Sequence, residues 1–524
     1  MSEKKVDRRT WIATVAAAIG GLAVGAAAGY FATPREVLEK MITTTVEKIE
    51  TKTVTVTGSP PKPEEELIRW WKEASKPYSG TTIKVLAQAW EPNFYLRDVV
   101  GPKFTELTGI KIDWELTSNE LVMEKEILDM ERGTGIYSST YDDQDMVGTW
   151  IRKGWTYDYT KLMDEHPELI EPAFNPDDIF PLPYCKDAKG HILSIPAEYF
   201  PKTYIYRTDL FESPKEKEDF RKKYGYELRP PRYYDEMLDI AEFFTRPPDL
   251  YGFIGADGAK AHEALGFDFF ETWFPSCGAT GEGLDPYPRD LLPGWGINTK
   301  TWSSRMENGG ALDSPQAVRA IETFLKWLPY APPGVRAMIY VESGEQQAAG
   351  KVAQAITYTQ FLSTYANPEL SKIAGKFRVT LPPVDREYWR PYMPIGYADI
   401  SGYTIPWCSP HPEAAFLWAQ FVISPLNELE RAKAINTTVR TSVLTNPALD
   451  PLDAKFGGVF SLIRDPIARK YFVGTPLEIG DYAPLLYVFY TTLAKAVAGE
   501  LTPKECANEL ARAIDEELVK LGYK

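Results

Sequence analysis

The chain has 524 residues, of which 44% are hydrophobic and 25% are charged, and this composition excludes a mainly disordered chain, a collagen and a polytopic membrane protein. The 73 acidic residues outnumber the 58 lysines and arginines, for a formal net charge of −15, which argues against nucleic acid as the main partner because phosphate binding needs a basic face. Four cysteines and four histidines argue against a disulfide scaffold or a histidine-rich metal protein.

Residues 1–33 predict a targeting and membrane-spanning segment. Four basic residues precede an uncharged apolar run from Trp11 to Thr33, which is long enough to cross the hydrocarbon core of a membrane as a helix. Because the positive flank comes first, the rest of the chain is expected outside the cytoplasm. The sequence DRRTWI resembles a twin-arginine export signal, and a simple signal-anchor is the alternative; both leave cleavage open.

Residues 34–80 are interpreted as a stalk linker followed by a helix that leads into the folded body. The stretch from Thr43 to Pro63 is rich in Thr, Val, Lys and Glu and ends in Ser-Pro-Pro-Lys-Pro. Closely spaced prolines hold a chain extended and semi-rigid. The stalk is therefore expected to keep the body away from the membrane, and a linker without a role is the alternative.

The body alternates short apolar runs with segments of helical spacing. Strands are predicted at 83–89, 110–116 and 137–141, and helices at 97–107, 120–131 and 145–153. The β-α-β-α order predicts a parallel sheet with helices on both faces. Later helices are marked by a capping residue followed by proline, at Ser213-Pro214, Ser314-Pro315 and Thr502-Pro503.

Motifs for nucleotide binding and catalysis are absent from the sequence. It contains no GxxxxGK[ST] loop, no dinucleotide fingerprint, no GxSxG elbow and no HExxH pair. The four histidines are isolated, and the acidic run from Asp142 to Asp145 lacks the glycine and the distal glutamate of a calcium loop. We therefore expect no cofactor, no metal and no ATPase activity in this chain.

Six stretches of the body, taken in order, carry a family resemblance. They are LAQAWEPNFYLRDVVGPKFTELTGIKIDWE, YDDQDMVGTWIRKGWTYDYTKLM, the run that begins KGHILSIPAEYFPKTYIYRTDLF, then APPGVRAMIYVESGEQQAAGKVAQAITYTQF, SKIAGKFRVTLPP and ISGYTIPWCSPHPEAAFLWAQFVIS. These stretches resemble the extracellular solute-binding proteins of ABC importers, in the maltose-binding-like sugar group (family 1). The similarity runs from about Thr81 to Ala513.

The resemblance implies an α/β, two-lobed periplasmic-binding-protein-like (type II) fold with hinge strands, preceded here by the N-terminal transmembrane helix. By matching segments, lobe one comprises 81–200 plus 380–437, and lobe two comprises 201–379 plus 440–524. The ligand is expected in a cleft between the lobes. Because it contacts both lobes only when they close, its binding shifts an open–closed equilibrium.

Three candidate ligand residues follow predicted strands. Trp90 follows the first strand, and Asp143 and Asp145 follow the third. Ligands of open α/β sheets bind beyond the carboxyl ends of the strands, where a ring can stack on a sugar and carboxylates can accept its hydroxyls. The alternatives are a tryptophan that packs at the sheet edge and aspartates that cap the next helix.

The resemblance implies further ligand residues by position. Glu198 and Tyr199 match the first crossing between the lobes, Tyr358 and Gln360 match a ligand-facing stretch, and Arg440 matches an element at the last crossing. Arg440 has the alternative of pairing with a carboxylate.

Three more aromatic residues are candidates. Tyr397 and Tyr403 flank the Ser401-Gly402 turn, where a small residue permits close approach of a ligand. Trp273 lies in the aromatic run FFETWFPSCG, for which core packing is the favoured alternative to a sugar-stacking role.

The sequence therefore predicts the extracellular substrate-binding component of an ABC importer, which captures a sugar or oligosaccharide and performs no chemistry. Its expected partners are permease subunits with a separate ATPase, and its expected place is the extracellular face of the cell membrane, tethered by the N-terminal helix. One alternative is a receptor for another polar solute, such as a polyol, a glycerol phosphodiester or a peptide. The other is a secreted glycan-cleaving enzyme, since paired carboxylates are spaced in the fold and not along the chain.

Overall fold

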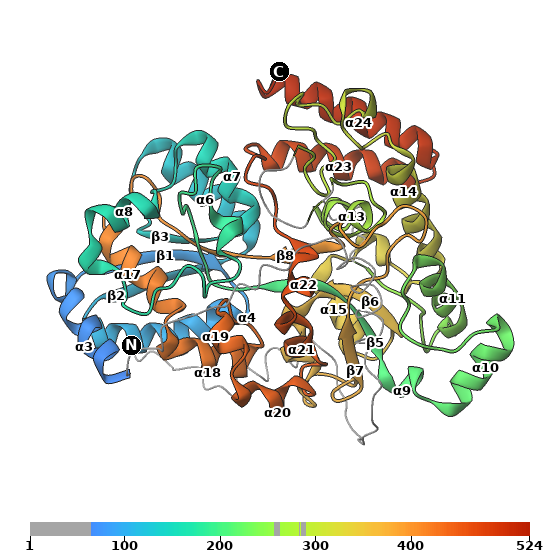
Figure 1. The fold of residues 1–524 in the computed structure, drawn as a ribbon, viewed down its shortest axis with the longest axis horizontal. Coiled ribbons are helices and arrows are strands. Elements are labelled where there is room, and N and C mark those ends of the chain that lie inside the picture. Colours follow the sequence, from blue (N-terminus) through green and yellow to red (C-terminus); the bar gives the residue numbers. More distant parts are fainter. Residues whose placement is uncertain (1–63, 256–262, 282, 284–289) are drawn as a thin grey trace, which may run out of the picture.

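The computed structural model describes residues 64–255, 263–281, 283 and 290–524, which form two α/β lobes side by side (Figure 1). No helix within these residues is both long enough and apolar enough to cross a membrane. The predicted transmembrane helix at 1–33 and the predicted stalk up to residue 63 lie outside the described residues.

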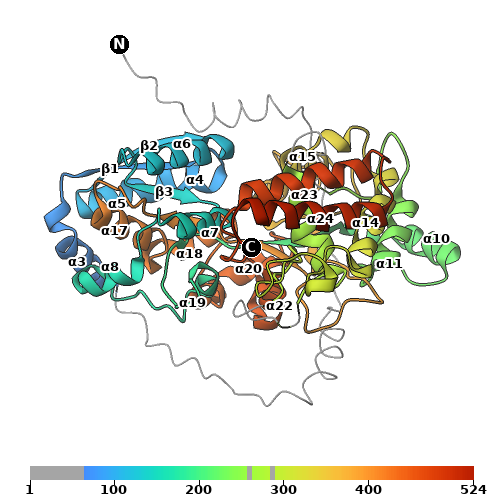
Figure 2. The same ribbon diagram turned by 90° about the horizontal axis from the view of Figure 1, so that it is seen from above.

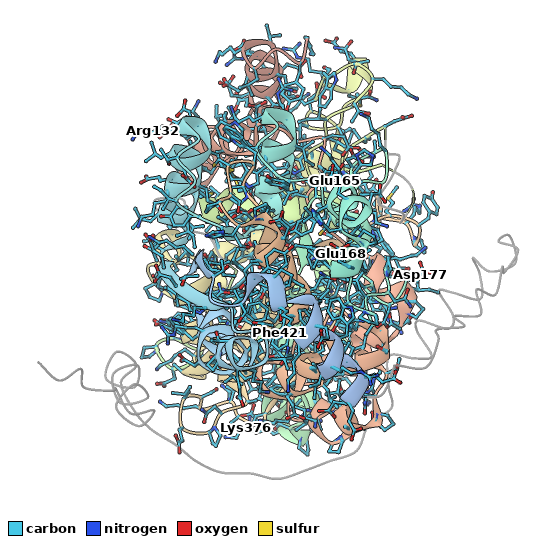
Figure 3. All side chains as sticks on the ribbon, turned by 90° about the vertical axis from the view of Figure 1, so that its left-hand side faces the viewer. Arg132, Glu165, Glu168, Asp177, Lys376 and Phe421 are labelled. Carbon is cyan, nitrogen blue, oxygen red and sulfur yellow. The ribbon has the colours of Figure 1, made fainter. Side chains whose placement is uncertain are left out.

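The first described element, α3 (Glu64–Ala74), packs on the outer side of one lobe. Its Trp71 is fully buried, and its ring meets that of Phe421 edge-on at 5.0 Å between centroids. The indole N–H of Trp71 donates to Glu171 Oε1 at 3.1 Å. Figure 3 shows α3 crossing this side of the molecule beside Phe421. One apolar face thus fixes the helix to the body.

Lobe one contains a five-stranded sheet in the order β2-β1-β3-β9-β4. β1 (Thr82–Gln88) pairs in parallel with β2 (Lys111–Thr117) and β3 (Ser139–Asp142), and all three lie at predicted strands. β9 (Gly402–Thr404) runs antiparallel to both β3 and β4 (Ile195–Pro196). The prediction of a parallel sheet is therefore confirmed for β1, β2 and β3, and β4 runs in the same direction. It is wrong for β9, which runs opposite to its neighbours β3 and β4.

The predicted helices of lobe one are present. The segment predicted at 97–107 is a π-helical turn, Leu96–Val100, followed by α5 (Gly101–Thr108), which ends at Gly109 with a φ of 73°. The other two are α6 (Asn119–Arg132) and α7 (Gln144–Lys153). The lobe also contains α4 (Glu91–Tyr95), α8 (Tyr159–Glu165), α17 (Pro412–Val422) and α18 (Pro425–Ile435).

Lobe two contains a second sheet in the order β10-β8-β5-β6, with β7 also paired to β5. β5 (Phe200–Arg207) is its long central strand and runs antiparallel to β6 (Gln354–Tyr358), β7 (Phe377–Thr380) and β8 (Gly396–Asp399). β10 (Phe472–Val473) runs parallel to β8.

Two short crossings join the sheets. β4 of the first sheet leads directly to β5 of the second, and β8 of the second sheet leads directly to β9 of the first. Both crossings run through the middle of the molecule (Figure 1). Short connections of this kind let two lobes rotate with few changes in backbone angles.

Helices cover the second sheet and the side of the molecule beyond it. α23 (Tyr482–Val497) and α24 (Pro503–Lys520) pack along each other, α24 also packs against α14 (Pro315–Trp327), and α23 also contacts α7 of lobe one (Figure 2). Ser213, Ser314 and Thr502 each accept a hydrogen bond from a first-turn amide, as predicted. The remaining helices are α9 (Thr208–Phe211), α10 (Pro214–Tyr224), α11 (Tyr234–Phe244), α12 (Glu263–Asp268), α13 (Phe274–Ser276), α15 (Tyr340–Ala348), α16 (Leu362–Tyr365), α19 (Thr441–Leu444), α20 (Asp450–Asp453), α21 (Val459–Arg464) and α22 (Pro466–Lys470).

Each sheet has its own hydrophobic core. The first core gathers residues such as Val85, Phe104 and Trp418, and the second gathers residues such as Trp327 and Phe489. The first core also includes residues of β5, β7 and α21, so hydrophobic packing continues past the crossings.

Candidate functional site

A cavity lies where the two lobes meet, and its empty space of about 620 Å³ is partly open to solvent. Its lining comes from both lobes and comprises Gln88, Trp90, Tyr141, Asp143, Asp145, Phe267, Glu271, Tyr340, Tyr358, Gln360, Tyr397, Asp399 and Ser401. Six of the predicted ligand residues are among them: Trp90, Asp143, Asp145, Tyr358, Gln360 and Tyr397.

The lobe-one wall is built at the carboxyl ends of β1 and β3. Trp90 follows β1 and directly precedes α4, and its ring lies 6.3 Å from that of Tyr141 and 5.9 Å from that of Phe200. Asp143 follows β3 and caps α7, its Oδ1 accepting from the amide of Asp145 at 3.2 Å. The alternative of a capping aspartate is thus correct for Asp143, which lines the cavity as well.

Asp145 joins lobe one to the other side of the cavity. It is buried, and its carboxylate accepts hydrogen bonds from the hydroxyls of Tyr397 at 2.8 Å, Tyr482 at 2.7 Å and Thr475. Burial raises the pKa of Asp145, and the three hydroxyl donors act against that rise. The carboxylate is therefore held by fixed donors from β8, α23 and the segment before it.

The lobe-two wall contains a buried ionic group. The hydroxyl of Tyr358 donates to both oxygens of Glu271, at 2.6 and 2.5 Å. The Lys202 ammonium donates to Glu271 Oε2 at 3.0 Å and to Asp268, so it bridges two carboxylates. Burial raises the pKa of Glu271 to about 8, and the charge of Asp145 adds to the rise while Lys202 opposes it.

Asp399 stands at the end of β8, at the crossing into the first sheet. Its Oδ1 accepts from the amide of Ser401 at 3.1 Å and from the Ser401 hydroxyl. Burial raises the pKa of Asp399 to about 6. Burial also raises the pKa of Asp143 well above its usual range, and the negative charges of Asp145 and Asp399 add to that effect.

A second compartment adjoins the first and shares Asp143, Asp145 and Phe267 with it. Its empty space of about 660 Å³ is lined further by Met123, Met146, Tyr482, Ala483, Leu486, Tyr487 and Tyr490. The cavity is thus polar and acidic at its centre and more apolar toward α23.

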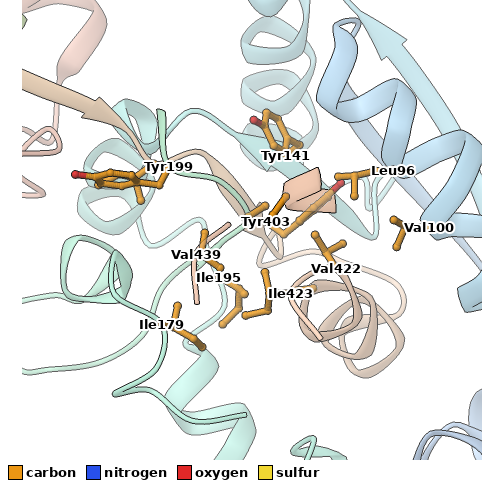
Figure 4. Close-up of a cluster of buried hydrophobic side chains, with 14 of the residues drawn as sticks. Leu96, Val100, Tyr141, Ile179, Ile195, Tyr199, Tyr403, Val422, Ile423 and Val439 are labelled. Carbon is orange, nitrogen blue, oxygen red and sulfur yellow. The ribbon is translucent and has the colours of Figure 1, made fainter. Parts of the chain in front are cut away.

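Three predicted residues lie behind the lobe-one wall. Glu198 is buried and accepts a hydrogen bond from the hydroxyl of Tyr141, so it supports a lining residue without lining the cavity itself. Tyr199 and Tyr403 belong to a hydrophobic cluster at the crossings (Figure 4). The ring of Tyr403 packs edge-on against Trp418, and the hydroxyl of Tyr199 donates to the carbonyl of Arg469 at 3.2 Å.

The last two predicted residues also have core roles. Trp273 is buried and stacks on Tyr234 at 5.0 Å between ring centroids, as its core-packing alternative states. Arg440 is buried, and its Nη1 donates to Asp178 Oδ2 at 3.0 Å and to the carbonyl of Ala173. The alternative of a carboxylate partner is thus correct for Arg440.

Seven lining residues were not predicted from the sequence: Gln88, Tyr141, Phe267, Glu271, Tyr340, Asp399 and Ser401. Two of them stand out in the sequence and could have been proposed from it. Glu271 is a charged residue inside the apolar run FFETWF, and Asp399 lies two residues before Ser401 of the Ser401-Gly402 turn at the crossing. A charge within a buried run needs a partner or a function. Residues such as Tyr340 offered no local sign.

Comparison with known proteins gives the family. The model of the bacterial extracellular solute-binding protein family matches residues 89–427, more than half of the chain. No curated protein matches the chain by sequence.

Solved structures share the fold. One similar structure is an ABC transporter solute-binding protein from Agrobacterium radiobacter K84 in complex with ribitol, at 20% identity over 84% of this chain and 99% of that chain, with a TM-score of 0.64. Another, from Agrobacterium vitis S4 with bound D-mannitol, has 18% identity over 84% and 99% of the two chains and a TM-score of 0.63. Maltose-bound MalE3 of T. maritima has 18% identity over 84% and 100%, with a TM-score of 0.63. With its two lobes, its cavity between them and the family match, this chain belongs to the bacterial extracellular solute-binding proteins.

Proposed function

We propose that this protein is the extracellular substrate-binding component of an ABC importer and that it captures a sugar, an oligosaccharide or a related polyol between its lobes. The observation that carries the proposal is the cavity to which both lobes contribute rings and carboxylates. Sugars and polyols present many hydroxyl donors, which carboxylates and amides accept, and sugar rings also present apolar faces on which aromatic side chains stack. The similar structures that hold ribitol, D-mannitol and maltose support this ligand class.

Capture is proposed to work by closure of the lobes. Ser363 Oγ donates to Glu91 Oε2 at 2.9 Å, and Asn436 Nδ2 donates to the carbonyl of Thr359 at 3.0 Å, so contacts form beside the cavity between segments far apart in sequence. A ligand that touches both walls stabilises the arrangement in which they meet. The predicted division into 81–200 plus 380–437 and 201–379 plus 440–524 remains part of the proposal.

Delivery then requires partners outside this chain. We propose permease subunits with a separate ATPase, which recognise the closed lobes and return the solute to the cell. The body is proposed to stand at the extracellular face of the membrane, tethered by the N-terminal helix predicted at 1–33. The proposed role includes no chemistry, so the solute leaves as it entered.

Binding and turnover are separated by one experiment. The purified chain is screened by thermal unfolding against sugars, oligosaccharides and polyols, and each mixture is then analysed by chromatography. A ligand present at 100 times its Kd raises the free energy of unfolding by about 2.7 kcal/mol and so raises the melting temperature. A rise with unchanged ligand supports a receptor; breakdown of a glycan at a rate proportional to protein concentration contradicts it.

A further inference from the structure

The charged side chains that line the cavity are all acidic. Four carboxylates line it, from Asp143, Asp145, Glu271 and Asp399, and no Arg, Lys or His is among its described lining residues. The cation behind the lobe-two wall is Lys202, and it is shared between Glu271 and Asp268. When all four carboxylates are ionised, the balance around the cavity is negative even after Lys202 is counted.

The four carboxylates differ in how fully their oxygens are used. Asp145 accepts three hydroxyl hydrogen bonds, and Glu271 has Tyr358 and Lys202. Asp143 accepts only an amide hydrogen bond, and Asp399 accepts only from Ser401, in both cases through Oδ1. Among the described residues, Oδ2 of Asp143 and Oδ2 of Asp399 have no hydrogen-bond partner, and both side chains face the cavity.

Aromatic rings form much of the remaining lining. Trp90 and Tyr141 belong to lobe one, Tyr358 and Tyr340 to lobe two, and Tyr397 to the strand that leads into the crossing. The faces of such rings carry partial negative charge and attract ammonium groups, most strongly where water is excluded. Rings and carboxylates together make a setting that favours a cation.

A neutral guest would leave this charge uncompensated. Hydroxyls can donate to the free oxygens, but they bring no positive charge, and like charges held near each other away from water are costly. Burial and the charges of Asp145 and Asp399 raise the pKa of Asp143 well above its usual range, so its ionised form is costly unless a cation lies near it. A guest with an ammonium group removes it.

Resting on the proposed function, the geometry points to a narrower ligand class: a hydroxylated solute that carries a positively charged nitrogen, as in an amino sugar or an amino polyol. The ammonium group lies between the free oxygens of Asp143 and Asp399, and the hydroxylated part stacks on the rings. Asp145 and Glu271, whose oxygens already have donors, shape the walls on either side.

Matched pairs of probes test the charge. The full chain is titrated calorimetrically with D-glucose and D-glucosamine, D-galactose and D-galactosamine, D-sorbitol and D-glucamine, and cellobiose and the chitosan disaccharide. Amines are expected to bind at least about tenfold more tightly than their neutral counterparts, the effect of one charge-assisted hydrogen bond. Calcium and magnesium chloride are titrated alone, and tighter binding of either ion than of every amine overturns the inference.

Three aspartate variants locate the ammonium site. Asp143→Asn keeps the helix cap, because asparagine caps as well as aspartate, and Asp399→Asn keeps an oxygen for Ser401. Asp177→Asn makes the same charge change on an exposed side chain. The two cavity variants are expected to lose about tenfold in affinity for the amine and little for the neutral partner, and Asp177→Asn to lose neither.

The possible failures are distinguishable. The ammonium site is overturned if neutral probes bind as tightly as amines and if Asp143→Asn and Asp399→Asn lose no more affinity for the amine than for the neutral probe. That result leaves the proposed capture of sugars intact. A chain to which no probe of either kind binds contradicts the proposed function as well.

Discussion

Two groups of carboxylates in this protein differ in how their charge is compensated. In lobe one, Glu428 is buried against Arg431, and it also accepts from the hydroxyl of Thr438. In the cavity, Asp143 and Asp399 are held by neutral donors alone among the described residues. The first arrangement is permanent, because both charges belong to the fold. The second leaves room for a charge that arrives with a ligand.

Arg440 extends the first arrangement. It lies 3.0 Å from Asp178 and 3.7 Å from Glu171, and its Nε donates to the carbonyl of Ile423 at 2.5 Å. Burial raises the pKa of Glu171 to about 7, and Arg440 opposes that rise. At Glu428, Glu171 and Asp178, this chain thus places an arginine beside the acid.

A third solution appears at Glu126 and Asp142, which are buried together in lobe one. Burial raises the pKa of both, and the charge of Asp142 adds to the effect at Glu126. This pair can hold a proton in place of a cation. Neither residue lines the cavity, so the pair is not available to a solute.

The largest effect is expected when Arg440, which compensates two acids of the first arrangement, is removed. Arg440→Ala leaves Glu171 and Asp178 without their cation, and truncation of a buried charge pair costs about 3–5 kcal/mol. Urea denaturation should show this loss in the free energy of unfolding. Arg221→Ala, which removes the cation of an exposed pair with Glu227, serves as the control and should change stability little. Equal losses in both variants would contradict the assigned role of Arg440.

The pH dependence of stability tests the carboxylates of the cavity and those paired with arginine together. The pKa is raised to about 6 at Asp399, about 7 at Glu171 and about 8 at Glu271. Between the unfolded pKa near 4 and these values the folded state binds more protons, so stability falls as pH rises. The free energy of unfolding, measured by denaturation at several pH values from about pH 5.5 to about pH 8.5, should decline by more than about 1 kcal/mol over that range. A flat or rising profile would show that these carboxyls ionise freely.

The ring of Trp90 at the lobe-one wall tests how much the cavity contributes to ligand affinity apart from its carboxylates. Trp90→Ala removes a flat apolar face from the cavity while Asp143 and Asp399 remain. Affinity for the best ligand of the screen should fall by about tenfold. Isothermal titration measures the loss, and Trp90→Phe should restore part of it. An unchanged Kd for Trp90→Ala would assign Trp90 to sheet-edge packing.

The smallest effect is expected in the empty protein. Asp399→Asn removes one of the like charges of the cavity, so the ligand-free variant should gain about 1 kcal/mol in stability near pH 8.5. Near pH 5.5 most of the gain should vanish, since Asp399 is then largely protonated. Thermal unfolding at both pH values checks this. A variant less stable than the parent at pH 8.5 would mean that Asp399 is compensated.

Local patterns in the sequence predicted three strands of lobe one and the starts of several helices in lobe two. β1, β2 and β3 follow from short apolar runs, and the helix caps at Ser314 and Thr502 follow from residues adjacent in the chain. β9 was not predicted, because its place beside β3 depends on a pairing with residues far away. Local hydrogen bonding determines the first kind of feature, and long-range pairing determines the second.

The sequence by itself determined that Trp90, Asp143 and Asp145 follow strands and that Tyr397 flanks the Ser401-Gly402 turn, and resemblance placed Tyr358 and Gln360 near the ligand. Only the tertiary structure decided which faces point into the cavity. Tyr199, Tyr403 and Trp273 are aromatic like the lining residues, yet they turn into the cores. Glu271 and Asp399 reach the cavity from separate strands and helices. The physical reason is that the direction of a side chain and the charge around it depend on packing between distant segments, which no local pattern records.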